Sequence, residues 1–72
     1  MKGITMIKNH LKEIRMKEYM LNKREFAKFL GIAEQQYIRY ENGVSSPSLK
    51  ICLKITTVLS KKIDDIWFQK ND

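Results

Sequence analysis

The stretch LNKREFAKFLGIAEQQYIRYENG, residues 21–43, decides the fold of this chain. It predicts two short helices that are joined by a tight turn at Gly31. Asn22 is placed to cap the first helix of this pair, and Glu25 follows three residues later, as a capping box requires. Gly31 ends this helix, because glycine adopts the left-handed conformation at little cost. The small side chain of Ala27 allows the two helices to cross closely.

The second helix of this pair is expected over residues 34–41, and it has two different faces. Tyr37 and Tyr40 lie three residues apart and face inward. The outer face carries amide, guanidinium and carboxylate groups, which can pair with base edges in the major groove of DNA. These outer residues are Glu34, Gln35, Gln36 and Arg39.

From about residue 9 onward, the chain resembles the Cro/C1-type (Xre) family of helix-turn-helix proteins. The matching motifs are Glu25-Phe26-Ala27, Leu30-Gly31-Ile32, Tyr37, Tyr40-Glu41-Asn42-Gly43, Pro47-Ser48-Leu49 and Asp64-Asp65-Ile66-Trp67. The resemblance implies an all-α fold, a compact five-helix lambda-repressor-like domain whose second and third helices form the helix-turn-helix. It also implies a transcriptional regulator, with a repressor as the first expectation, that inserts residues 34–41 into the major groove of double-stranded DNA.

The size and charge of the chain fit one small domain with an anionic partner. Its 72 residues carry 14 Lys and Arg against 8 Asp and Glu, a net charge of +6. Such an excess favours nucleic acid or an anionic lipid surface. No apolar run has the length of a membrane span, and the N-terminus lacks the apolar core of a signal peptide. We therefore expect a cytoplasmic protein with no membrane contact.

The sequence predicts neither an enzyme nor a metal site. His10 is the only histidine and Cys52 the only cysteine, and they are far apart, so they form no nucleophile–base pair. A single His is also too little for a metal site, which needs three or four ligands. The lone Cys52 excludes an internal disulfide and is expected to be buried on a helix. No cofactor and no small-molecule ligand are expected.

The expected domain covers residues 9–68, with an N-terminal arm or tail at 1–8 and a C-terminal tail at 69–72. The alternation of Ile4 and Met6 leaves a short strand or arm open as an alternative, but a frayed tail is the favoured interpretation. The first helix is expected from Asn9 or His10 to about Tyr19, with Leu11 and Ile14 inward. Compared with the family, the join that follows this helix has one extra residue and no Gly.

Two further helices are expected in the second half. Ser46 is placed to cap a helix over residues 47–59, with Pro47 in its first position. Residues 60–62 form a turn where relatives carry Gly or Asn, and a short helix over 63–67 follows, with Ile66 and Trp67 inward. An exposed Phe68 hints at a dimer contact. The inward residues of the longer helix are expected to be Leu49, Cys52, Leu53, Ile55, Thr56 and Leu59.

The family pattern places base contacts on the outer face of the third helix. The amide of Gln35 or Gln36 can pair with adenine, and the fork of Arg39 can pair with guanine. Glu34 has two interpretations, a contact to cytosine or a favourable charge at the helix N-terminus. Ala33 stands where relatives often carry Ser or Thr, which removes a side-chain cap.

Other residues are assigned to phosphate contacts or to structural roles. The first phosphate candidates open the second helix or follow the third, where Asn42 has a helix cap as its alternative role. The phosphate candidates are Asn22, Lys23 and Asn42, with Lys28 and Ser45 as secondary ones. The resemblance implies an ion pair of Arg15 with Glu41, and a solvated Arg15 is the alternative. The structural residues are Ala27, Gly31, Arg15 and Glu41.

Two functions from different classes remain open. The first is a homodimeric regulator, in which two recognition helices roughly 34 Å apart read a palindrome. The second is a protein-interaction module on the same scaffold, for example an antitoxin-like partner binder. In that case the N-terminal arm, Trp67 and Phe68 would form the contact. The polar outer face of the third helix favours the first function, because partner surfaces usually carry apolar anchors.

Overall fold

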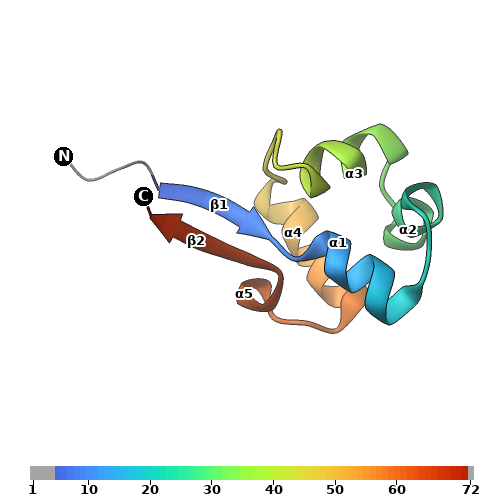
Figure 1. Ribbon diagram of the computed structural model, residues 1–72. Coiled ribbons are helices and arrows are strands. Elements are labelled where there is room, and N and C mark those ends of the chain that lie inside the picture. The colour runs from blue at the N-terminus through green and yellow to red at the C-terminus, as the bar shows by residue number, and fades with distance from the viewer. Residues whose placement is uncertain (1–4, 72) are drawn as a thin grey trace.

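The computed structural model describes residues 5–71, and its body is a small bundle of helices (Figure 1). The element order is β1 (Thr5–Asn9), α1 (Leu11–Glu13), the π-helix η1 (Ile14–Tyr19), α2 (Lys23–Leu30), α3 (Glu34–Glu41), α4 (Leu49–Leu59), α5 (Ile63–Ile66) and β2 (Trp67–Asn71). The predicted five-helix domain is confirmed, with α2 and α3 as the helix-turn-helix. The structure adds a β-ribbon that the all-α prediction did not contain.

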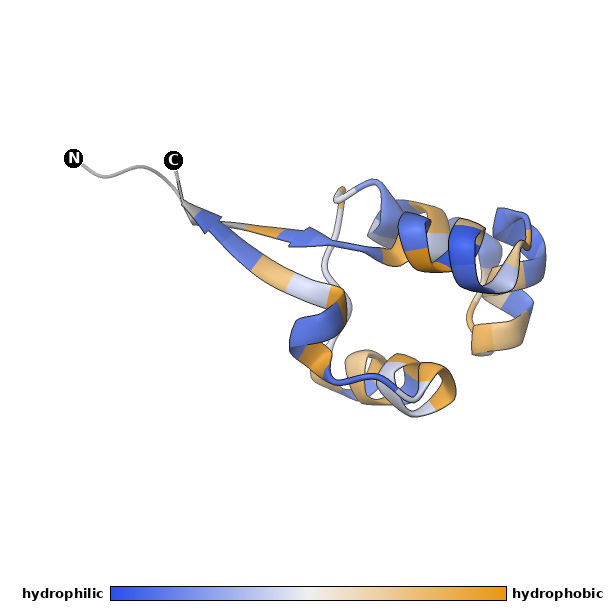
Figure 2. Cartoon of the chain, turned by 60° about the horizontal axis from the view of Figure 1, so that its bottom comes forward, coloured by the Kyte–Doolittle hydropathy of each residue, from blue (hydrophilic) through white to orange (hydrophobic). Residues whose placement is uncertain are grey.

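The ribbon joins the two ends of the described chain. β1 and β2 pair in antiparallel fashion, with Asn9 opposite Trp67 and Thr5 opposite Asn71. They extend side by side away from the helical body (Figures 1 and 2). The frayed N-terminal tail is therefore wrong for residues 5–8, and the C-terminal tail is wrong for 69–71, because each segment supplies the other's backbone partners. Residues 1–4 and 72 lie outside the described residues.

The first helix begins as α1 and continues as η1. Leu11 and Ile14 are buried, as predicted. The π-helical turn is wider than an α-helical one and takes up one additional residue, which accounts for the longer join before α2. Met20 then ends the helix in the left-handed conformation, with φ 52°. It does so without a glycine, and its side chain is 82% exposed.

The helix-turn-helix has the local geometry that its sequence predicts. Asn22 Oδ1 accepts a hydrogen bond from the Glu25 amide at 2.8 Å, and Glu25 Oε1 accepts one from the Asn22 amide at 3.0 Å. This capping box begins α2. Gly31 ends α2 with φ 79°, and the Ile32 amide donates back to the Ala27 carbonyl at 3.0 Å. The chain is thereby turned into α3.

The core lies between the helices, and aromatic side chains form a large part of it. Phe26 of α2 meets Tyr37 of α3 edge to face, with ring centroids 5.4 Å apart. Trp67, at the start of β2, packs against the buried cluster. The buried cluster consists of Leu11, Ile14, Phe26, Ala27, Leu30, Tyr37, Tyr40, Ile55, Leu59 and Ile66. Every helix contributes to it, so the core fixes α3 against the rest of the body.

The start and the buried face of α4 differ from the prediction. Ser48, not Ser46, is the cap, and its Oγ accepts from the Ile51 amide at 3.3 Å. Leu49 and Leu53 are 68% and 55% exposed, so their predicted inward orientation is wrong. This helix carries few hydrophilic residues (Figure 2), and periodicity alone therefore could not select its buried face. The inward residues are Ile51, Ile55, Val58 and Leu59.

α5 is shorter than predicted, because Trp67 already belongs to β2. Asp65 Oδ2 accepts from the Lys62 amide at 3.2 Å and so closes the first turn of α5. Ser60 takes the left-handed conformation, with φ 55°, in the turn where relatives carry Gly or Asn. Phe68 is 38% exposed, and one of its faces stacks on His10 at 4.6 Å between ring centroids.

Candidate nucleic-acid interface

The outer face of α3 is open to solvent. Its four outer residues are all exposed, while Tyr37 and Tyr40 on the opposite side are buried. The helix has no side-chain cap at Ala33, as the sequence predicts. α3 therefore presents a polar surface, and its tyrosines hold it to the core. The four outer residues are Glu34, Gln35, Gln36 and Arg39.

Gln36 differs from its neighbour Gln35 in one respect. Its Nε2 donates a hydrogen bond to the Tyr40 hydroxyl at 2.8 Å. This bond orients the amide along the helix and occupies one of its donors. The side-chain carbonyl oxygen of Gln36 and the second hydrogen on its Nε2 stay available for other hydrogen bonds. The two glutamines, equivalent in the sequence, are therefore not equivalent in the structure.

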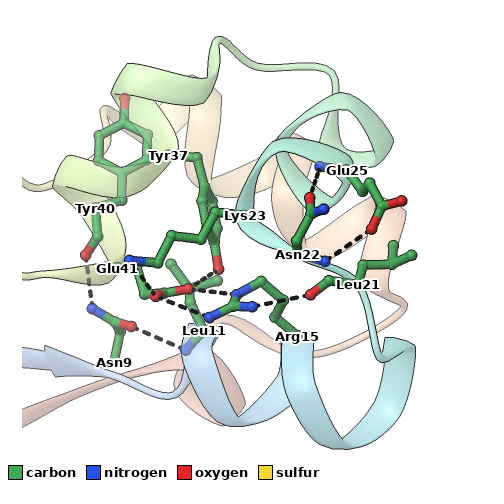
Figure 3. Close-up of polar contacts among 10 residues, drawn as sticks. All are labelled: Asn9, Leu11, Arg15, Leu21, Asn22, Lys23, Glu25, Tyr37, Tyr40 and Glu41. Atoms are coloured by element: carbon green, nitrogen blue, oxygen red, sulfur yellow. Dashed lines mark hydrogen bonds and ion pairs between the residues drawn. The ribbon is translucent and has the colours of Figure 1, made fainter.

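The C-terminal end of α3 is held by an ion pair to the first helix (Figure 3). Arg15 Nε donates to Glu41 Oε2 at 2.9 Å, and the two side chains are 9% and 3% exposed. The Tyr37 hydroxyl donates to the same carboxylate oxygen. Arg15 Nη1 also donates to the Leu21 carbonyl at 3.0 Å, just before α2. The pair that the resemblance implies is present, and it joins three elements.

This environment keeps the carboxylate charged. Burial alone would raise the pKa of Glu41, but hydrogen bonds from Arg15 and Tyr37, together with the charges of Arg15 and Lys23, lower that pKa below its ordinary value. The hydrogen bond to Glu41 raises the pKa of Arg15. Burial, and then the bond to Glu41, raise the pKa of Tyr37. At neutral pH the site holds a neutral Tyr37 phenol beside the paired charges of Arg15 and Glu41.

Comparison with known proteins identifies the family. Residues 11–66 match the sequence model of the helix-turn-helix family. This chain belongs to the Cro/C1-type helix-turn-helix family, a family of DNA-binding regulators. It is similar to an HTH-type transcriptional regulator of Methanocaldococcus jannaschii, with 38% identity over 66 residues, covering 92% of this chain and 98% of the relative. It is also similar to an HTH-type transcriptional regulator of Archaeoglobus fulgidus, with 34% identity over 61 residues, covering 85% and 84%.

In this helix-turn-helix protein, the residues assigned to phosphate contacts are not equally accessible. Asn22, Lys28 and Asn42 are exposed, although Asn22 Oδ1 is occupied by the capping box. Lys23 is 42% exposed, and its Nζ lies 3.9 Å from Glu41 Oε1. Ser45 Oγ is buried and has no hydrogen-bond partner among the described residues, so its hydroxyl does not face a ligand in this conformation.

One residue at the site was missed by the sequence interpretation. Asn9, the last residue of β1, donates from Nδ2 to the Tyr40 carbonyl near the end of α3, at 2.9 Å. Its Oδ1 accepts from the amide of Leu11, the first residue of α1, at 3.0 Å, although His10 and not Asn9 is the N-cap residue (Figure 3). An Asn side chain commonly accepts from the backbone amide two residues later, so this local bond could have been predicted from the sequence. The contact to α3, however, depends on tertiary structure.

Other kinds of site find little support in the described part of this helix-turn-helix protein. Residues 5–71 contain no group of His, Cys, Asp and Glu suited to a metal ion. Cys52 is half-buried, and burial raises the pKa of its thiol, which disfavours the reactive thiolate. Within the same residues, no helix is long and apolar enough to span a membrane.

Proposed function

We propose that this helix-turn-helix protein is a transcriptional regulator that binds double-stranded DNA sequence-specifically, with α3 in the major groove. The observation that carries the proposal is the outward polar face of α3 on a helix whose opposite face is fixed in the core. A rigid helix with amide and guanidinium groups along one side is what base recognition needs. Between a repressor and an activator, we propose a repressor.

Each outer residue has a role in this proposal. Gln35 pairs its amide with adenine, and Arg39 places its guanidinium fork on guanine. Gln36 has a fixed orientation, because of its bond to Tyr40, and reads a base with its remaining donor and acceptor. Glu34, in the first turn of α3, favours the helix N-terminus or accepts a hydrogen bond from cytosine.

Phosphate contacts set the position of α3 in the groove. We assign Lys23 and the side-chain amide nitrogen of Asn22, at the start of α2, to a phosphate of one DNA strand. The free backbone amides of the same helix end point to that phosphate as well. Asn42, exposed at the end of α3, takes a second phosphate. Lys28 is a secondary candidate, and Ser45 takes part only if its buried hydroxyl turns outward. The net charge of +6 supplies attraction to the duplex.

A homodimer completes the proposal. One α3 reaches only a few base pairs, so two copies around a twofold axis, with recognition helices roughly 34 Å apart, read a palindromic site.

The second candidate function is the protein-interaction module, including the antitoxin-like version. The observation in its favour is the exposure of Leu49 and Leu53 on α4. Tight binding of a purified partner without detectable DNA binding at low salt would support the module and contradict the regulator.

The test is selection of bound duplexes from a random pool by the parent and by four variants. We expect Gln35→Ala and Arg39→Ala to lose preference at different positions. Arg39→Lys is the matched control for charge, because it keeps the cation but not the bidentate fork. Gln69→Ala, on the exposed part of β2, is the control for Gln35→Ala.

The outcomes separate the parts of the proposal. Arg39→Lys is expected to lose the guanine preference while the dependence of affinity on salt stays that of the parent, with a slope of about −0.9 per neutralised phosphate. Unchanged preferences in both alanine variants would refute the base assignments. Equal affinity of the parent for all duplexes would refute sequence-specific regulation.

A further inference from the structure

The N-terminal half of α3 is held less firmly than its C-terminal half. The C-terminal half has Glu41 in the ion pair with Arg15 and the Tyr40 carbonyl bonded to Asn9. At the other end, Ala33 gives no side-chain cap. Gln35, which we assign to a base, lies in this first turn. Its position therefore depends on how the turn that precedes α3 is fixed.

That turn is tied to α4 by one long-range side-chain bond. Lys54 Nζ donates to the Gly31 carbonyl at 2.8 Å, across 23 residues of sequence. The backbone of the turn already uses the Gly31 amide, which donates to Lys28 and Ala27. The Gly31 carbonyl is one of the free acceptors that the end of a helix leaves open. Lys54 satisfies this acceptor from a different helix.

The side chain of Lys54 also packs directly over Gly31. A Cβ placed on Gly31 would lie 3.1 Å from both Cε and Nζ of Lys54, which is closer than ordinary contact. Glycine at this position therefore serves two needs, the left-handed φ of 79° and the space for Lys54. Gly31 and Lys54 line the same groove, which is also lined by Ala33, just before α3, and by Gln36 of α3.

We propose that Lys54 is a positioning residue for base recognition: by holding the Gly31 carbonyl, it sets the direction in which α3 leaves the turn. The proposal rests on the function proposed above and adds a specificity-determining residue that touches no DNA. α4 is fixed in the core through Ile55 and Leu59, so Lys54 connects the turn to a rigid support. A cation that acts in this way changes base preference more than it changes salt dependence.

The first measurement needs no DNA. Hydrogen exchange of the Tyr37 amide, which donates to the Ala33 carbonyl at 3.0 Å, reports opening of the first turn of α3. We expect Lys54→Met to accelerate this exchange about three- to tenfold, the range that one hydrogen bond supports. Lys50→Met is the matched control, because Lys50 is exposed on the same helix and the charge change is the same. Lys54→Arg keeps a donor and is expected to restore slow exchange.

The second measurement is a ratio of two affinities. One is for the selected DNA site, and the other is for the same site with the base pair that Gln35 is proposed to read replaced. We expect Lys54→Met to reduce this ratio about threefold or more, while Lys50→Met and Lys54→Arg retain it. The salt slope should be the same for Lys54→Met and Lys50→Met. A slope that falls by about 0.9 in Lys54→Met alone, with exchange unchanged, would make Lys54 a phosphate contact and overturn the proposal.

The two proposals fail in different ways. If the parent discriminates among no duplexes, the regulator function is lost, and the exchange result still decides whether Lys54 holds the turn. If the parent discriminates but Lys54→Met behaves as Lys50→Met in both exchange and affinity ratio, only the role of Lys54 is refuted. Thermal unfolding of each variant shows that the exchange is compared between folded proteins.

Discussion

Arg15 and Glu41 lie 26 residues apart in sequence, and their side chains meet at 2.9 Å with almost no exposure to solvent. A buried charge whose partner is removed is costly, whereas an apolar pair in the same place is tolerated much better. The Leu21 carbonyl and the Tyr37 hydroxyl also take part, so this pair connects the first helix, the start of α2 and the end of α3.

The first prediction concerns the stability that depends on this pair. Arg15→Met is expected to lower the free energy of unfolding by about 3 kcal/mol, because it leaves Glu41 buried without its main partner. The double variant Arg15→Met, Glu41→Met is expected to be more stable than Arg15→Met alone. Denaturant titration measures both, with Arg24→Met as the control at an exposed arginine. A double variant that is less stable than Arg15→Met alone would contradict this argument.

The second prediction concerns acid pH. The folded state lowers the pKa of Glu41 below its ordinary value near 4.5. A carboxyl group with a lowered pKa contributes stability above the ordinary value and loses it as the pH falls through the folded value. We therefore expect stability to decline below about pH 4.5 more steeply in the parent than in the double variant. Unfolding curves at several pH values test this, and equal acid slopes would contradict it.

The sequence predicts the helix-turn-helix well because its signals are local. The Asn22–Glu25 capping box, the left-handed Gly31 and the spacing of Tyr37 and Tyr40 all act within a few residues, and the structure has each of them. Their exposed counterparts follow from helical geometry alone. The proposed base-contact face could therefore be placed from sequence, although the bond between Gln36 and Tyr40 that distinguishes the glutamines could not.

The features that sequence did not predict depend on distant parts of the chain. β1 forms only because β2 returns beside it more than fifty residues later. The local alternation left a strand open as an alternative, but nothing near it in the sequence indicates its partner. The buried face of α4 was misassigned because Leu49, Ile51, Leu53 and Ile55 are equally apolar. Lys54 looks like an ordinary surface lysine until Gly31 is placed beneath it.

The third prediction concerns the left-handed residue between η1 and α2. Met20 has φ 52° and a side chain that is 82% exposed, so its replacement removes strain and little packing. Left-handed backbone costs a residue with a Cβ about 1–2 kcal/mol, and the extra freedom of glycine in the unfolded chain offsets part of that gain. Met20→Gly is expected to stabilise the protein by about 0.5–1 kcal/mol in denaturant titration. Met16→Gly, an exposed site inside η1, should instead destabilise it.

The fourth prediction concerns the bond that orients Gln36. Tyr40→Phe removes the hydroxyl that accepts from Gln36 Nε2 at 2.8 Å, while the buried ring keeps its packing. The freed amide has to be ordered when DNA binds, and we expect a loss of roughly three- to tenfold in affinity for the preferred duplex. Binding curves with that duplex measure the loss, with Tyr19→Phe as the control. In a Gln36→Ala background Tyr40→Phe should have no further effect. A loss of the same size in that background would show that the hydroxyl acts independently of the amide.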